Sequence, residues 1–236
     1  MANAQLIAEW LSTPQGSAVI AAAQDAAAGP QDVERLRRQF PEIATDFVGA
    51  AIHQAWLRAR ERKRWGQSSG FLLTSDGLEQ ATRPAVANFH AQRATEFAGP
   101  TATIVDLTCG LGFDAAALAR AGHRVTAVER DPDVATFARH NLAPLDVEVV
   151  TADAVDFALP TGTDLVFIDP ARRDPSAARD VRGGTTRQLD PSAWSPAWPW
   201  ICGLGAQVRV LAKAAPGIDD RHLGGWDTDF VSSDGD

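Results

Sequence analysis

The stretch IVDLTCGLGFDA, residues 104–115, decides the fold of this chain. An apolar segment ends in an acid, Asp106, and a tight turn containing Gly110 and Gly112 then opens directly into an alanine-rich run. A strand, a glycine turn and a helix start present unpaired backbone N–H groups and a partial positive charge to a ligand. Glycines let the backbone come close to that ligand. The stretch therefore predicts a site for an adenosine-containing cofactor.

Two cofactors are compatible with this turn. The run GLGFDA also fits the G-x-G-x-x-G/A pattern of nicotinamide dinucleotide binding, but that pattern alone is weakly specific. Three acids favour S-adenosylmethionine (SAM). Asp106 can meet the cationic amino-acid part of SAM, directly or through water, and Glu129 can accept hydrogen bonds from both ribose hydroxyls. Asp153 is suited to the adenine amino group, or alternatively caps a short turn.

Strands and helices alternate from residue 103 onward. The expected strands are 103–108, 124–129, 147–151, 164–169, 207–212 and 228–232, and the expected helices are 113–121, 132–141 and 190–203. This alternation predicts an α/β fold in which a mostly parallel sheet is covered by helices on both faces. Ligands of such sheets bind at the carboxyl ends of the strands, where Asp106, Glu129, Asp153 and Asp169 fall.

A small helical N-terminal domain is expected over residues 1–70, ahead of an α/β domain over residues 71–236. Prolines mark the helix boundaries, with a start at Thr13-Pro14, an end at Gly29-Pro30 and a start at Phe40-Pro41. In the last of these helices an apolar stripe runs from Ile43 to Ala55 at helical spacing.

The motifs together resemble those of class I SAM-dependent methyltransferases. DLTCGLG is similar to the first motif of that family, AVERDP to the acidic end of its second strand, TADA to the loop after its third strand, and DPAR to its catalytic loop. The resemblance covers residues 75–232 and implies a Rossmann-like methyltransferase fold. Thr108 is a departure, because many members have a glycine there.

The resemblance also implies a set of cofactor contacts. They are Asp106, Thr108, Cys109, Gly110, Gly112, Phe113, Glu129, Arg130, Asp153 and Ala154. Gln80 and Thr82 are further candidates, since the segment before the first strand often folds over the cofactor in RNA methyltransferases of this fold. An ordinary turn and cap is the alternative for them. Asp131 is expected to be a helix N-cap. The simplest role for Asp114 is to cap the helix that starts beside it.

The DPAR run resembles the (Asp/Asn)-Pro-Pro-(aromatic) loop of methyltransferases that act on exocyclic amino groups of bases. There the acid and the proline carbonyl accept hydrogen bonds from the amine, a role that would fall to Asp169 and Pro170. Ala171 replaces the second proline and Arg172 the aromatic residue. Arg172 can stack on a base, contact a phosphate or form an ion pair with Asp169.

Substrate contacts are expected from Arg173, Trp194 and Lys213, where Trp194 either stacks on a base or packs against the sheet. The motifs look most similar to RNA methyltransferases of the guanine exocyclic-amino type, and to bacterial methyltransferases with a THUMP-like C-terminal domain. This resemblance implies SAM as cofactor and an RNA, rRNA or tRNA, as substrate. The alternatives are a methyltransferase of a small molecule or protein, a non-catalytic RNA-binding scaffold, and a nicotinamide dehydrogenase.

Composition and charge limit the partners and the location that we expect for this protein. The chain has 236 residues, 45% of them apolar, and a net charge of −8, which weighs against a broad nucleic-acid-binding face. Basic clusters within residues 58–64 and 172–187 can still hold a few phosphates. Without a bilayer-length apolar run, a secretory start or a disulfide framework, we expect a cytoplasmic protein with no membrane contact and no metal.

The end of the sequence carries a further expectation. Asp234-Gly235 is a hairpin-turn signal, yet no strand-like run follows it. The methyltransferase fold closes with an antiparallel strand at this point. The sheet is therefore expected to lack its last strand, and the sequence to be truncated at its C-terminus.

Overall fold

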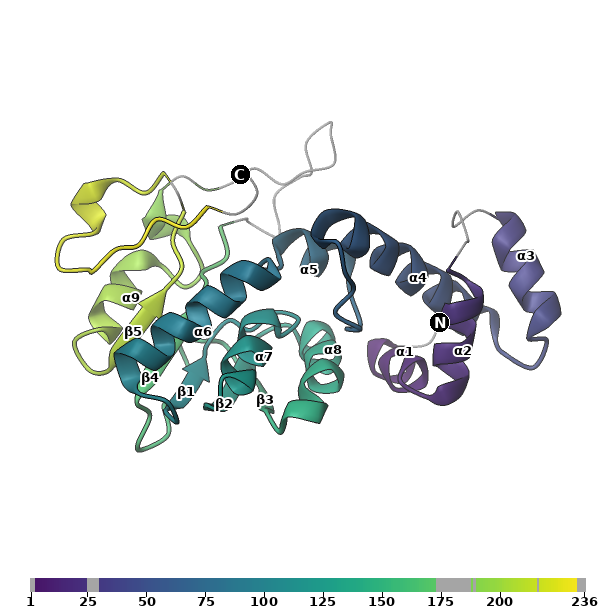
Figure 1. Ribbon diagram of the computed structural model, residues 1–236, viewed down its shortest axis with the longest axis horizontal. Coiled ribbons are helices and arrows are strands. Elements are labelled where there is room, and N and C mark those ends of the chain that lie inside the picture. Colours follow the sequence, from purple (N-terminus) through teal and green to yellow (C-terminus); the bar gives the residue numbers. More distant parts are fainter. Residues whose placement is uncertain (1–2, 25–29, 173–187, 189, 216, 233–236) are drawn as a thin grey trace.

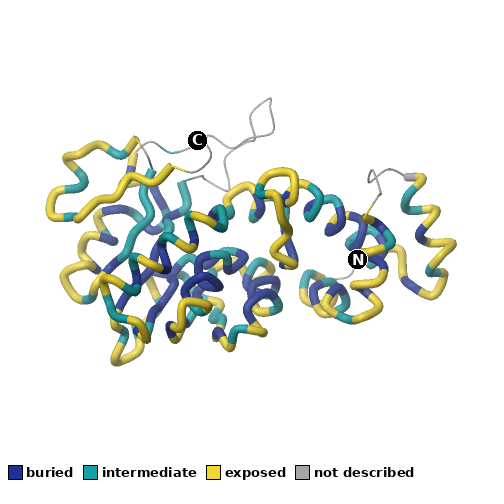
Figure 2. The backbone as a smooth tube through the Cα atoms, in the orientation of Figure 1, coloured by how far each residue is buried: buried dark blue, intermediate teal, exposed yellow. Residues whose placement is uncertain are grey.

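The computed structural model describes residues 3–24, 30–172, 188, 190–215 and 217–232. Its helical N-terminal part lies at one end of an elongated molecule, and a sheet flanked by helices lies at the other (Figure 1). Buried residues concentrate in the sheet and on the inner sides of the helices around it (Figure 2).

Five parallel strands form the sheet. They are β1 (Thr103–Asp106), β2 (Arg124–Glu129), β3 (Glu148–Thr151), β4 (Leu165–Ile168) and β5 (Arg209–Ala212), in the order β3-β2-β1-β4-β5. All four neighbouring pairs are parallel. The predicted parallel sheet is confirmed. The chain continues outward from β1 to β3 and then returns to the other side of β1, which opens a crevice at the carboxyl ends of β1 and β4.

Helices cover both faces of this sheet. On one face lie α6 (Pro84–Ala98), α7 (Phe113–Arg120) and α8 (Pro132–Leu142), and on the other lies α9 (Trp198–Leu204). Successive strand side chains alternate between the two cores, as the two-residue period of a strand requires. Ile104 packs on the α6–α8 side, and its neighbour Val105 packs on the α9 side.

Two predicted elements differ in the structure. The helix expected over 190–203 is a 3-10 turn, η2 (Pro191–Ala193), followed by α9 only from Trp198, because Pro196 and Pro199 supply no N–H groups for a continuous helix. The strand expected over 228–232 does not form. Asp227 and Asp229 instead form ion pairs with Arg93 of α6, and Phe230 is 82% exposed, so no apolar burial favours a strand there.

The N-terminal part consists of helices, as predicted. They are α1 (Ala4–Leu11), α2 (Pro14–Ala22), α3 (Pro30–Gln39), α4 (Thr45–Trp65) and the short α5 (Ser75–Gln80). The Thr13 side chain caps α2 by accepting from Gly16 N. Two boundary predictions are wrong. Pro30 begins a helix, the position where its fixed φ costs least, and α4 begins at Thr45 after a turn rather than at Pro41.

The two ends of the molecule share one core. Buried residues of α1, α2 and α4 belong to the same apolar cluster as those of α6, α7, α8 and the strands. A polar contact reinforces it, since the Asn141 side chain accepts from Leu72 N at 2.7 Å and donates to Leu72 O and Leu111 O, both at 3.0 Å. One buried amide on α8 thus joins the segment before α5 to the glycine turn.

Candidate active site

A cavity of about 780 Å³ lies at the carboxyl ends of the strands, a volume typical of small-molecule sites. Most of the predicted ligand-binding residues line it. These are Gln80, Thr82, Thr108, Cys109, Gly110, Phe113, Glu129, Arg130, Asp153, Ala154, Asp169, Pro170, Ala171, Arg172 and Lys213. The segment over residues 74–82, which includes α5, supplies a further part of the wall. The structure therefore brings residues from five strand ends and this segment to one cavity.

Four predicted residues lie elsewhere. Asp106 is fully buried behind the wall, and Gly112 faces Leu142, which a Cβ would approach to 2.9 Å. Trp194 is buried in the core on the α9 side, where its ring packs edge-on against Trp198 and its Nε1 donates to Gln188 O at 3.1 Å. Arg173 lies outside the described residues.

The glycine turn follows β1 and leads into α7. Gly110 and Gly112 have φ of 55° and 93°, in the left-handed region that favours glycine. A Cβ at Gly110 would meet nothing within 4 Å, so this backbone faces the open cavity. Between the glycine turn and β2, Cys109 N donates to Val128 O at 2.9 Å. Burial raises the pKa of the Cys109 thiol far above its usual value, so it stays protonated and is no nucleophile.

Backbone N–H groups hold the acids beside β2 and β3. Glu129 accepts from Gly110 N at 3.0 Å through Oε2 and from Asp131 N at 2.8 Å through Oε1. Burial raises the pKa of Glu129. Asp153 accepts from Val155 N at 3.1 Å, as its alternative role as a turn cap required, and it also lines the cavity. Each carboxylate oxygen has a second acceptor position, so both acids can still bind a ligand.

Asp106 lies behind the cavity wall, at the end of β1. Its Oδ1 accepts from Thr108 N at 3.1 Å, while its buried Oδ2 has no hydrogen-bond partner within the described part of the chain. Burial, followed by the charge of Asp114, raises the pKa of Asp106 well above its usual value. The open glycine turn and the two carboxylate oxygens of Glu129, in contrast, line the cavity and fit a nucleoside cofactor.

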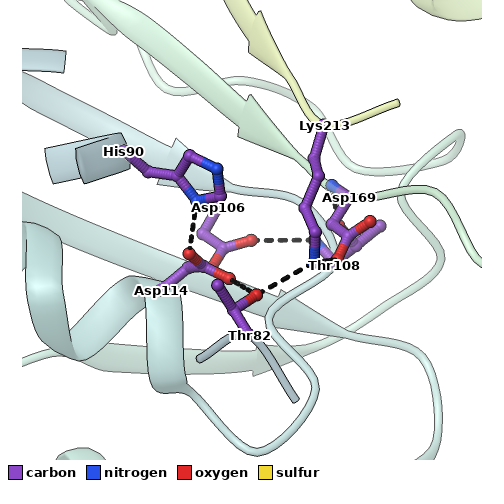
Figure 3. A network of polar contacts seen from close by, with 7 residues as sticks. All are labelled: Thr82, His90, Asp106, Thr108, Asp114, Asp169 and Lys213. Atoms are coloured by element: carbon purple, nitrogen blue, oxygen red, sulfur yellow. Dashed lines mark hydrogen bonds and ion pairs between the residues drawn. The ribbon is translucent and has the colours of Figure 1, made fainter. Parts of the chain in front are cut away.

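Side chains, in contrast, hold the acid beside β4. Lys213 Nζ, just past β5, contacts Asp169 Oδ2 at 2.5 Å and donates to Thr82 Oγ1 at 3.0 Å (Figure 3). The backbone N of Asp169 donates to Thr108 Oγ1 at 2.8 Å. The threonine that departs from the family pattern therefore anchors the loop that begins at Asp169. Ala171 is anchored too, by a two-hydrogen-bond antiparallel bridge to Ser195.

The network continues behind the wall to a residue that the sequence analysis missed. Thr82 Oγ1 donates to Asp114 Oδ2 at 2.5 Å, and Asp114 Oδ1 lies 2.8 Å from His90 Nδ1 (Figure 3). Asp114 is thus more than a helix cap. No local motif marks His90, which lies 24 residues before Asp114 in an otherwise ordinary helix.

Two features are absent from the described residues. None of their helices has both the length and the apolar character needed to cross a membrane. Within the same ranges, no group of three or more His, Cys, Asp or Glu side chains is placed to hold a metal ion.

The sequence is also similar to a family model and to known proteins. Residues 104–178 match the family model described as a methyltransferase domain, and residues 7–60 match a domain of unknown function. An uncharacterized SAM-dependent methyltransferase of Mycobacterium tuberculosis is 34% identical over 196 residues, which are 80% of this chain and 49% of that protein. A ribosomal RNA small subunit methyltransferase J of Aeromonas salmonicida is 39% identical over 158 residues, or 60% of this chain and 54% of that one.

A solved structure agrees on the fold. A candidate methyltransferase of Porphyromonas gingivalis W83 superposes with a TM-score of 0.55 at 24% identity, over 84% of this chain and 48% of that one. The chain spans about half the length of the curated relatives it matches. The sheet order and the glycine turn give a Rossmann-like methyltransferase fold, and the matched methyltransferase domain and the SAM-dependent relative support SAM as its cofactor.

Proposed function

We propose that this class I domain transfers a methyl group from SAM to an exocyclic amino group of an RNA base, with guanine favoured. The observation that most supports this is the position of the Asp169 carboxylate, on the cavity wall beside the glycine turn and directly before Pro170. The name of the Aeromonas salmonicida relative, a ribosomal RNA methyltransferase, supports RNA as the substrate class.

SAM, when bound, supplies an electrophilic methyl group on its sulfonium sulfur. Gly110 and Glu129 would hold its nucleoside part, and Asp153 its base. The Asp169 carboxylate and the Pro170 carbonyl can only accept hydrogen bonds. They therefore favour an NH₂ group, which can donate, over an oxygen that carries no hydrogen. By accepting both amine hydrogens they would aim the nitrogen lone pair, and most of the rate enhancement would come from this positioning.

One observation favours a second candidate. The net charge of −8, together with Ala171 and Arg172 in place of the second proline and the aromatic residue, suits a methyltransferase of a small molecule or a protein. The two candidates share the cofactor half of the site and differ only in the acceptor of the methyl group.

The decisive experiment incubates the protein with methyl-labelled SAM and total RNA, and then separates the nucleosides. We expect label in an amino-methylated guanosine, and loss of this label by at least about a hundredfold in Asp169→Ala. Calorimetric titration with S-adenosylhomocysteine should give an affinity within about twofold of the wild type for this variant. The exposed Asp156, changed to Ala in the same way, is the matched control.

Three outcomes would contradict the proposal. Label that enters a small molecule or protein but no RNA would favour the second candidate. Full RNA methylation by Asp169→Ala would remove Asp169 from the chemistry. Binding of NADH but not of S-adenosylhomocysteine would show that the cofactor is a nicotinamide dinucleotide.

A further inference from the structure

We infer that Lys213 is a positioning residue for Asp169, and that Thr82 fixes Lys213 in that role; the inference rests on the function proposed above. Sequence analysis predicted that Lys213 contacts substrate. The contacts of its ammonium group assign it to the catalytic carboxylate instead.

Strand register brings the two residues together. The last pair of the β4–β5 ladder is Ile168 with Ala212, and Lys213 N donates to Ile168 O at 2.8 Å. Asp169 and Lys213 therefore leave adjacent parallel strands side by side. Their side chains are only 26% and 25% exposed, and Nζ lies 2.5 Å from Oδ2. Partial burial reduces the screening that makes surface ion pairs weak.

A second contact fixes the direction of the lysine. A lysine side chain has four rotatable bonds, so one ion pair alone leaves it considerable freedom. Thr82, only 6% exposed, accepts a hydrogen bond from Nζ while its own hydroxyl proton points to Asp114. Asp114 is in turn held by His90. Nζ thus lies between two fixed acceptors, and the Asp169 carboxylate is oriented through it.

The charges around Asp169 also support a positioning role for Lys213. Asp106, Asp114 and Asp169 lie close enough that the charges of the other two contribute to the raised pKa of Asp106. Neighbouring carboxylates favour protonation of one another, and a protonated acid loses acceptor capacity. The Lys213 ammonium, 2.5 Å from Asp169 Oδ2, places a positive charge among these carboxylates. A phosphate would have to compete with two acceptors already in place.

The first test needs no enzymatic activity. The sequence contains two lysines, Lys63 and Lys213, and Lys63 is exposed. Acylation with a soluble acetylating reagent, followed by peptide mass spectrometry, measures both rates in one sample. We expect Lys213 to react at least about tenfold more slowly than Lys63, because its Nζ is held by Asp169 and Thr82 and is partly shielded from the reagent. Asp169→Asn and Thr82→Val should each raise the Lys213 rate several-fold. Equal rates in the wild type would overturn the inference.

The second test separates positioning from substrate contact. Lys213→Met should lower kcat by about thirtyfold or more while KM for RNA and the affinity for S-adenosylhomocysteine change by about twofold at most. Lys213→Arg should recover much of kcat, since a guanidinium can also bridge two acceptors. Arg120→Met, an exposed cation at the end of α7 and outside both basic clusters, is the control. A raised KM with unchanged kcat would make Lys213 a substrate contact and refute positioning.

The two proposals can fail separately. If the wild type methylates no RNA while Lys213 is protected as expected, the proposed function fails and the pairing stands. If RNA is methylated and Lys213→Met behaves as the wild type, the positioning role fails alone.

Discussion

The two halves of the cavity hold their acids by different means. Beside β2 and β3, Glu129 and Asp153 accept from backbone N–H groups that belong to the same turn or to the adjacent loop. Beside β4, Asp169 depends on the side chains of Lys213 and Thr108. Backbone donors are supplied by the path of the chain and survive most substitutions, whereas a side-chain donor is lost in one. The half with Glu129 and Asp153 is therefore the more robust, and the half with Asp169 is the more easily tuned.

Removing an acid from the robust half should have the largest effect. In Glu129→Ala, Gly110 N and Asp131 N lose their acceptor and the cofactor loses a ribose contact. We expect the affinity for S-adenosylhomocysteine to fall by at least about thirtyfold, measured by calorimetry. Glu148→Ala, an exposed acid on neighbouring β3, should leave it unchanged. An unchanged affinity in Glu129→Ala would show that the acid does not bind the cofactor.

Removing a side-chain contact of Asp169, in the other half, should not change the affinity for the cofactor. Thr108→Val keeps the shape of the side chain but removes the acceptor of Asp169 N. We expect kcat to fall about tenfold, the effect of one hydrogen bond, with S-adenosylhomocysteine affinity within about twofold. Thr136→Val on the exposed surface of α8 controls for the exchange itself. A loss of affinity equal to the loss of kcat would erase the distinction between the halves.

A smaller effect should follow from the open side of the turn. Gly110→Ala places a methyl group in the cavity, and we expect a loss of S-adenosylhomocysteine affinity of about fivefold. The left-handed φ should also lower the free energy of unfolding by about 1 kcal/mol. Gly162→Ala, with φ of 87° and nothing within 4 Å of its Cβ, carries the same backbone cost outside the cavity. Equal affinities in the two variants would argue against close approach of the cofactor to Gly110.

The smallest effect concerns Asp106, between the halves. Its pKa in the folded chain lies well above its usual value of 3.8, so the native state retains a proton that the unfolded chain releases. The associated stability is complete below about pH 4 and is lost as the pH rises. Relative to Asp106→Asn, the wild type should thus lose free energy of unfolding between pH 4 and pH 7 in denaturant titrations. A difference that stays constant over this pH range would contradict this.

Local patterns explain what the sequence could predict. The five strands and the glycine turn follow from runs of a few residues, and so do the backbone-held acids at the strand ends. The network through Thr82, Asp114, His90 and Lys213 could not be predicted, because its contacts join residues 24 to 131 positions apart. Of the two errors in the second half of the chain, the one over 228–232 has the same cause, whereas the one over 190–203 has a local cause. Prolines divided the helix expected over 190–203, and ion pairs with Arg93 replaced the pairing expected over 228–232.

The Asn141 contact has a consequence for how the molecule comes apart. Because one amide joins the glycine turn to the segment that follows α4, and one apolar cluster runs from α1 to β4, the N-terminal helices have no interior of their own to retain on heating. The chain should therefore melt in a single cooperative step, with one heat-absorption peak. Substitutions that destabilise α1 or α2 should then also destabilise the glycine turn, although it lies far along the chain.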